Sequence, residues 1–264
     1  MSKIEDALKK IEAAREQAPS AEGEQAPPPA SVVIGSPAQA NIDQRIVAYH
    51  EPLESPAAAF SQIHVDIRNN NPEISTIGFT SAWKGEGKSV VALNVAIALA
   101  RDCEEATVCI VDADLHKPSQ HSLLGLQNTV GLSDALTGTM PASSLTIPTP
   151  VNRLFLLPAG SKAPNPKSLF SSARVEDVIA ELQSRYTFTI YDCPPVLLCP
   201  ETKDLAVHLQ GVVLVVRANK TNRKLVDKAR AKLQPETEQG GVDIIGFVLN
   251  KAESEWKIGR KHKR

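Results

Sequence analysis

The segment from 81 to 89 reads Ser-Ala-Trp-Lys-Gly-Glu-Gly-Lys-Ser and has the residue types needed to bind phosphate. Gly85 and Gly87 let the backbone bend so that successive N–H groups point at one anion. Lys88 is placed to reach the β- and γ-phosphates of a nucleotide, and the hydroxyl of Ser89 is placed to hold Mg²⁺. The usual pattern is G-x-x-x-x-G-K-[ST], and Ala82 stands where its first glycine would be. The segment therefore predicts a variant phosphate-binding loop and nucleoside triphosphate chemistry.

Two acidic motifs follow short apolar runs. Asp112 and Asp114 come directly after the run at 107–111, and Asp192 follows the run at 188–191. A carboxylate at a strand end can coordinate Mg²⁺, directly or through water, or take a proton from an attacking hydroxyl. The alternatives are a solvated acidic turn for the first motif and a capping aspartate for the second. Asn250 ends the last apolar run, where it is either a turn residue or a donor to a base edge.

Strand-like and helix-like patterns alternate along the chain and must position these residues. This alternation predicts an α/β fold of the P-loop NTPase type, with a mostly parallel central sheet flanked by helices. Ligands bind at the carboxyl ends of the strands in such sheets, and each motif above lies at such an end. We expect strands at 75–80, 107–111, 153–158, 187–191, 211–217 and 243–249. We expect helices at 57–68, 88–101, 172–185 and 221–233, with shorter pieces at 117–125, 131–137 and 201–209.

The 264 residues divide into four segments of different composition. Residues 1–17 predict a short amphipathic helix, which is either a mostly solvated helix or a docking segment. Residues 18–45 are rich in Pro and Ala and predict a flexible N-terminal linker. Residues 46–252 predict the folded domain. Residues 253–264 form a basic tail, for which we expect a solvated end or at most weak contact with anionic lipid.

Composition excludes several classes of function. The formal net charge of −1 gives no general attraction to nucleic acid. The four cysteines form no C-x-x-C pair, and no histidine lies at metal-ligand spacing from them, so we expect free thiols. No apolar run reaches the length of a membrane span, and the N-terminus lacks the apolar core of a signal peptide. We therefore expect a cytoplasmic protein whose membrane association, if any, comes through a partner or the basic tail.

The motifs in their order resemble the bacterial tyrosine kinases of capsule and exopolysaccharide export, a branch of the P-loop ATPases that includes the ParA/MinD group. The resemblance implies transfer of the γ-phosphoryl group of ATP to tyrosines, with ATP and Mg²⁺ as cofactors. It also implies a membrane-spanning polysaccharide co-polymerase as activating partner and is compatible with a homodimer or higher homo-oligomer. It covers roughly residues 57–252 and is carried by the motifs at 80–89, 111–120, 131–138, 157–160, 164–172, 191–196 and 213–218.

The resemblance also implies a role for individual residues. It makes Lys88, Asp112 and Asp114 catalytic. It makes Asp192 a Mg²⁺-ordering acid together with Ser89 and Asp112, and it places Asn250 near the adenine. The nucleotide would lie against a continuous stretch of the loop and the first helical turn: Lys84, Gly85, Glu86, Gly87, Lys88, Ser89 and Val90.

The chain departs from the family pattern at several positions. Family members usually end in a tyrosine cluster, whereas this chain has three tyrosines, of which Tyr49 is the one expected to be exposed. Lys84 stands where the family generally has proline, and it either contacts phosphate across a dimer interface or is a solvated lysine. His116 stands where the family usually has arginine. These departures leave a second hypothesis open, an ATP-switched regulatory ATPase of the ParA/MinD kind that docks on a membrane partner without kinase activity.

Overall fold

In this computed structural model, residues 41–234 and 241–252 are described, and their strands form one sheet in the order β3-β4-β2-β5-β1-β6-β7. Every neighbouring pair of strands is parallel except β3 and β4, which are antiparallel. The mostly parallel sheet expected from the sequence is thereby confirmed. The strand bounds are β1 Thr76–Ser81, β2 Val108–Asp112, β3 Ile147–Pro148, β4 Leu154–Leu157, β5 Phe188–Asp192, β6 Gly211–Arg217 and β7 Ile244–Asn250.

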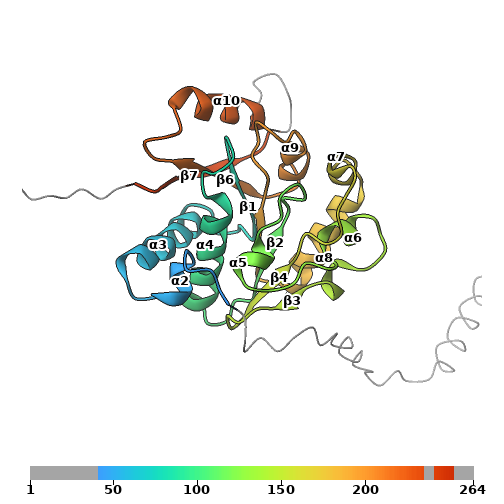
Figure 1. The fold of residues 1–264 in the computed structure, drawn as a ribbon, viewed down its shortest axis with the longest axis horizontal. Helices are drawn as coiled ribbons and strands as arrows, with labels where there is room; N and C mark the ends of the chain where they lie inside the picture. Colours follow the sequence, from blue (N-terminus) through green and yellow to red (C-terminus); the bar gives the residue numbers. More distant parts are fainter. Residues whose placement is uncertain (1–40, 235–240, 253–264) are drawn as a thin grey trace, which may run out of the picture. The chain divides into compact units, whose positions relative to one another are not determined.

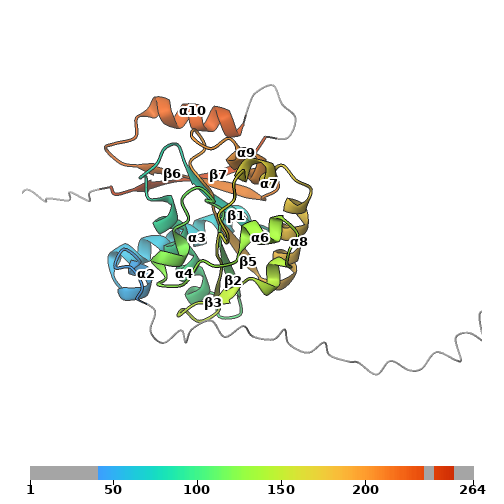
Figure 2. The same cartoon turned by 45° about the vertical axis from the view of Figure 1, so that its right-hand side comes forward.

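Helices cover both faces of the sheet. Figure 1 shows α2, α3 and α4 on one side and α6, α7 and α8 on the other. Figure 2 shows α10 alongside β6 and β7. The helix bounds are α2 Val47–His50, α3 Ser55–Asn70, α4 Lys88–Asp102, α5 Gln120–Leu123, α6 Leu132–Leu136, α7 Pro166–Phe170, α8 Arg174–Arg185, α9 Glu201–Ala206 and α10 Arg223–Leu233, with a 3₁₀ turn η2 at Ala142–Ser144.

The near-continuous apolar strands follow from this two-sided cover. Side chains alternate between the faces of a strand, so a strand buried on both faces needs apolar residues at every position. In β6, Val213 and Val215 pack into the cluster that contains α4, while Val212 and Leu214 pack into the cluster that contains α10. The two clusters hold β6, and with it the neighbouring phosphate loop, at a fixed position in the sheet.

The expected strands and long helices are confirmed to within two residues at most boundaries. The sequence patterns did not predict α2, α7 or the two-residue strand β3, since each is too short to show a period. The linker boundary at 45 was wrong: Ile42 is 3% exposed and belongs to the core, so the folded domain begins before residue 46. The expectations for 1–17, for 18–40 and for the tail after 252 lie outside the described residues.

None of the helices within the described residues is both long enough and apolar enough to cross a membrane. All four cysteines are free, as expected. Two of the three tyrosines are buried, Tyr186 at 4% and Tyr191 at 1% exposure, whereas Tyr49 is 41% exposed. The expectation that Tyr49 is the exposed tyrosine is therefore confirmed.

Candidate active site

The phosphate-binding loop joins the carboxyl end of β1 to the first turn of α4. Gly85 and Gly87 have φ angles of +81° and +92°, a region that side chains with a Cβ rarely adopt. A Cβ on Gly87 would also lie 2.1 Å from Nδ2 of Asn250. The φ angle thus favours glycine at this position, and any Cβ would also displace the amide of Asn250. The bend leaves the N-terminus of α4, the positive end of its dipole, at the loop.

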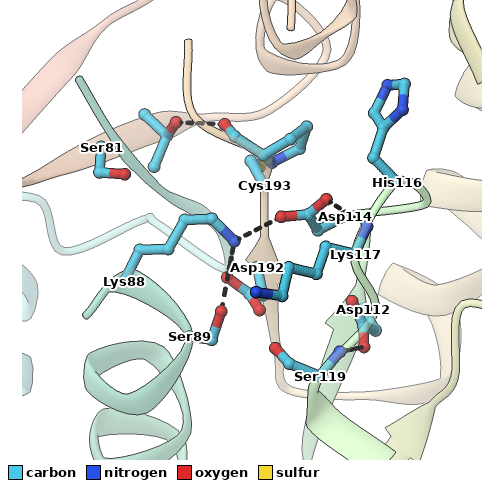
Figure 3. Close-up of polar contacts among 12 residues, drawn as sticks. Ser81, Lys88, Ser89, Asp112, Asp114, His116, Lys117, Ser119, Asp192 and Cys193 are labelled. Carbon is cyan, nitrogen blue, oxygen red and sulfur yellow. Dashed lines mark hydrogen bonds and ion pairs between the residues drawn. The ribbon is translucent and has the colours of Figure 1, made fainter. Parts of the chain in front are cut away.

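The side chain of Lys88 lies at the centre of the site, only 8% exposed. Its Nζ is 2.9 Å from Asp114 Oδ2 and 3.0 Å from Asp192 Oδ1, and it donates to Ser89 Oγ at 3.2 Å (Figure 3). Burial alone lowers the pKa of Lys88, but the negative charges of Asp192 and Asp114 outweigh burial and hold the pKa above its usual value. The ammonium group therefore stays charged and joins the first turn of α4 to the carboxyl ends of β2 and β5.

Asp112 is fully buried and is held at only one of its carboxylate oxygens. Its Oδ2 accepts hydrogen bonds from the backbone N–H groups of Ser119, at 2.8 Å, and Gln120, at 2.9 Å. Its Oδ1 has no hydrogen-bond partner among the described residues. Burial, followed by the charge of Asp192, raises the pKa of Asp112 to about 7 despite the backbone donors. A buried oxygen without a partner is costly, and such an atom at a strand end marks a place for a ligand or a proton.

Gln120 belongs to the site although sequence reasoning gave it no role. Its side chain is fully buried at the start of α5, and Nε2 donates to Asp192 Oδ2 at 2.8 Å and to the carbonyl of Ser89 at 3.1 Å. Gln120 thereby fixes both Asp192 and the first turn of α4. The available signal was a polar residue eight positions after Asp112 inside a recognised motif, but the sequence did not indicate that it is buried.

Glu86 and Asn250, both expected to line the nucleotide, make contacts within the protein. The buried carboxylate of Glu86 accepts from the backbone N–H of Trp83 at 2.8 Å and from the hydroxyl of Thr221. Asn250 Nδ2 donates to the carbonyl of Glu86 at 2.8 Å, and its Oδ1 accepts from the N–H of Lys251 at 2.9 Å. These bonds tie the phosphate loop to the ends of β6 and β7, so both residues hold the shape of the loop.

Lys84 and Val90 lie at the two ends of the expected nucleotide stretch. Lys84 is exposed and lines a cavity of about 290 Å³ beside the loop, together with Arg217 and Lys220. Val90 is partly buried, packs against the core cluster around α4, and its carbonyl accepts from Asn94 Nδ2 at 2.8 Å. The structure therefore separates Lys84 from the buried group around Lys88 and brings Ser89, Asp112, Asp114 and Asp192 together.

The donor set fits Mg²⁺ and the phosphates of a nucleotide. Mg²⁺ takes oxygen ligands, and the hydroxyl of Ser89, the carboxylate of Asp192 and the unpartnered Oδ1 of Asp112 are all oxygen donors at one edge of the sheet. The glycine conformations and the helix N-terminus supply the cradle that an anion needs. The residues present thus fit a Mg²⁺–nucleotide complex.

The sheet order, the phosphate loop and the two aspartates at neighbouring strand ends define a P-loop nucleoside triphosphatase. The ParA family model, described as "NUBPL iron-transfer P-loop NTPase", matches residues 74–255. The tyrosine-protein kinase YwqD of Bacillus subtilis is 30% identical over 211 residues, which are 79% of this chain and 86% of that protein. The tyrosine-protein kinase CpsD of Streptococcus agalactiae is 29% identical over 73% of this chain and 82% of its own length.

Structural comparison gives the same result. The crystal structure of the chimerical protein CapA2B2 superimposes with a TM-score of 0.73 at 28% identity and covers 81% of this chain and 92% of that chain. The chain belongs to the bacterial tyrosine-protein kinase family, within the ParA-type P-loop NTPases. Both of these relatives, YwqD and CpsD, are named as tyrosine-protein kinases.

Proposed function

We propose that the chain transfers the γ-phosphoryl group of ATP to a tyrosine hydroxyl and that it acts in exopolysaccharide or capsule biosynthesis. The observation that carries the proposal is the convergence at Lys88, whose Nζ lies within 3.0 Å of Asp114 and Asp192 while Asp112 keeps an unpartnered oxygen beside them. Such an arrangement suits a reaction in which phosphate charge is stabilised and a hydroxyl proton is removed.

Each polar group has a proposed part in the transfer. Lys88 and the loop N–H groups neutralise charge on the transferring phosphoryl group. Ser89 and Asp192 would hold Mg²⁺ directly and Asp112 would order it through a water molecule, and the ion would supply charge neutralisation at the phosphates. Oδ1 of Asp112 accepts the proton of the tyrosine hydroxyl as its oxygen bonds to phosphorus and the bond to the ADP oxygen breaks. In the metal-free chain, burial and the charge of Asp192 raise the pKa of Asp112 to about 7.

The acceptor is either Tyr49 of a copy of this chain or a tyrosine of another protein. Tyr49 is 41% exposed on α2, whereas Tyr186 and Tyr191 are buried and closed to an external active site. We propose a membrane-spanning polysaccharide co-polymerase as the partner that activates the chain. This part of the proposal rests on the family resemblance, and co-purification from the native membrane with a tagged chain would test it.

Phosphosite mapping by mass spectrometry after incubation with Mg·ATP tests the function. We expect phosphotyrosine on wild-type chain or an added partner segment, and none with Lys88→Ala or Asp112→Ala. Tyr49→Phe separates the two acceptors, because it removes the autophosphorylation site and leaves transfer to a partner intact. ATP hydrolysis to free phosphate without phosphotyrosine, across all partner segments tried, would replace the kinase proposal by the ATP-switched regulatory ATPase.

A further inference from the structure

A second group of side chains with metal-binding atoms lies on the segments that follow β2 and β5, beside the active site. In the described part of the chain, His116, Cys199 and Glu201 bring one donor atom each to within 4.8 Å of one another. His116 Nε2 already contacts Glu201 Oε1. None of the three has a part in the phosphoryl transfer proposed above. We propose that these three side chains form a binding site for Zn²⁺ that regulates the adjacent active site.

The donor set selects zinc rather than magnesium. An imidazole nitrogen, a thiolate sulfur and a carboxylate oxygen are the ligands that Zn²⁺ takes, whereas Mg²⁺ and Ca²⁺ take oxygen alone. Ligand atoms around a tetrahedral zinc lie about 3.5 Å apart, given Zn–N and Zn–S distances of about 2.0 and 2.3 Å. His116 Nε2 and Glu201 Oε1 are in direct contact, so zinc would have to part these two atoms and lie between them, with Cys199 Sγ within 4.8 Å of both.

The two ends of the group differ in their freedom to move. The side chain of Glu201 is 4% exposed and opens helix α9, so its carboxylate is fixed. The side chain of His116 is 48% exposed and is free to shift its Nε2 relative to Glu201. Cys199 lies in a turn closed by its N–H to the carbonyl of Pro195 at 3.0 Å. The exposed side chain of His116 can therefore move away from Glu201 to admit the metal, while the other two ligands stay in place.

The group joins the loop that carries Asp114 to the segment that follows Asp192. His116 lies two residues after Asp114, and Lys117 N–H donates to Asp114 Oδ1 at 3.0 Å within that loop. Cys199 and Glu201 lie on the segment that follows Asp192, the last residue of β5. Figure 3 shows His116 on the same loop as Asp114, above the group around Lys88. Zinc bound here would therefore link the loop of Asp114 to the segment that follows Asp192.

The expected consequence is inhibition of phosphoryl transfer. A dication held by His116 would restrain the loop of Asp114 and add positive charge beside the Asp114–Lys88 ion pair, whose atoms lie 2.9 Å apart. Three protein ligands leave a fourth position of the zinc open to water or to a phosphate oxygen. This consequence rests on the proposed function, whereas binding of the metal does not.

The first experiment measures binding by the full chain without a purification tag. Co²⁺ serves as the spectroscopic probe, because a cysteine thiolate bound to it gives a near-ultraviolet charge-transfer band that added Zn²⁺ removes. Wild type and Cys103→Ser, the matched control at a distant cysteine, should show the band, and Cys199→Ser should not. His116→Arg should weaken Zn²⁺ binding at least about tenfold. Absence of the band in wild type, or equal Zn²⁺ affinity in Cys199→Ser, would overturn the site.

The second experiment measures phosphoryl transfer at saturating Mg·ATP as Zn²⁺ is added. Wild type should lose activity at the concentration that fills the site, and Cys199→Ser should keep its zinc-free rate throughout. Inhibition of both proteins at the same Zn²⁺ concentration would overturn the regulatory role. If wild type binds Co²⁺ through Cys199 but transfers no phosphate under any condition, the metal site stands and the proposed function fails. If wild type transfers phosphate but binds no Co²⁺ through a thiolate, the proposed function stands and the metal site fails.

Discussion

The two ends of helix α4 each carry a cluster of charged side chains, and the clusters differ in the direction in which the pKa of an aspartate is shifted. At the N-terminal end, Lys88 and three aspartates crowd together, and Oδ1 of Asp112 is left without a partner among the described residues. At the C-terminal end, Asp102 accepts from Arg101 at 2.7 Å and contacts His64 Nε2 at 2.9 Å.

One aspartate in each cluster, Asp112 and Asp102, has a shifted pKa, and the two shifts have opposite signs. Burial and the charge of Asp192 raise the pKa of Asp112 to about 7. Burial also works against ionisation of Asp102, but hydrogen bonds from Arg101, His64 and Ser61 outweigh it and lower the pKa to about 2. The C-terminal cluster therefore stabilises the fold, which includes holding α3 on α4. At the N-terminal end, the raised pKa of buried Asp112 means that ionising this carboxyl group costs stability, as expected of a group at a functional site.

Replacing Asp112 by Asn should have the largest effect on phosphoryl transfer. It should also change the free energy of unfolding in the opposite direction, toward higher stability. The amide keeps an acceptor for the N–H groups of Ser119 and Gln120 but can neither ionise nor take a proton. We expect phosphoryl transfer to fall at least about 100-fold. The free energy of unfolding of the metal-free protein should rise by about 1 kcal/mol or more near neutral pH, because a disfavoured buried charge is removed.

The pH dependence of that gain follows from the sign of the shift. The unfolded chain ionises Asp112 near the ordinary value of 3.8, whereas the folded chain keeps the proton up to about pH 7. The wild type therefore loses stability as pH rises from about 4 to about 7, and Asp112→Asn does not lose that part. Urea unfolding at pH 5 and pH 8, with exposed Asp177→Asn as control, measures it. If the stability difference between Asp112→Asn and wild type becomes smaller as pH rises, Asp112 does not have the raised pKa that distinguishes it from Asp102.

Gln120→Ala should have the second largest effect. It removes the bonds to Asp192 and to the carbonyl of Ser89 but leaves every charge in place. We expect transfer to fall about tenfold, since a positioning residue is lost rather than a reacting one. Steady-state kinetics against Gln62→Ala, an exposed glutamine on α3, measures it. A positioning role also predicts a changed Mg²⁺ dependence, and an unchanged one would leave Gln120 with a purely structural role.

Asn250→Ala should act on nucleotide binding more than on the rate of transfer. It removes the bond from Nδ2 to the carbonyl of Glu86, which ties β7 to the phosphate loop. A net hydrogen bond of about 1 kcal/mol corresponds to a rise in KM for ATP of about fivefold, with kcat changed less than KM. A fall in kcat with constant KM would show instead that the loop shapes the transition state through this contact.

The sequence predicted the members of the N-terminal cluster better than their contacts. The phosphate loop and the aspartates carry local signals, namely glycine spacing and acids at strand ends, and a parallel sheet brings those ends together. Gln120 lacked such a signal because its role depends on burial under a loop. The contact between His116 and Glu201 joins residues 85 positions apart, so no ligand spacing in the sequence could reveal it. Ile42 was assigned to the linker because one apolar residue in a polar stretch has no period.

Asp102→Asn should have the smallest effect and should act on stability alone. It removes the charge that Arg101 and His64 contact at the C-terminal end of α4, at a cost of about 1 kcal/mol at pH 7. Because the folded pKa lies near 2 and the unfolded value is 3.8, the loss should be constant above pH 4 and should fade as pH drops toward 2. Denaturant midpoints at pH 7, 5 and 3 measure it, with exposed Asp66→Asn on α3 as control. Phosphoryl transfer should stay at the wild-type rate. A reduced rate at full stability would mean that the two ends of α4 are coupled, and the division into a stabilising end and a reactive end would then be wrong.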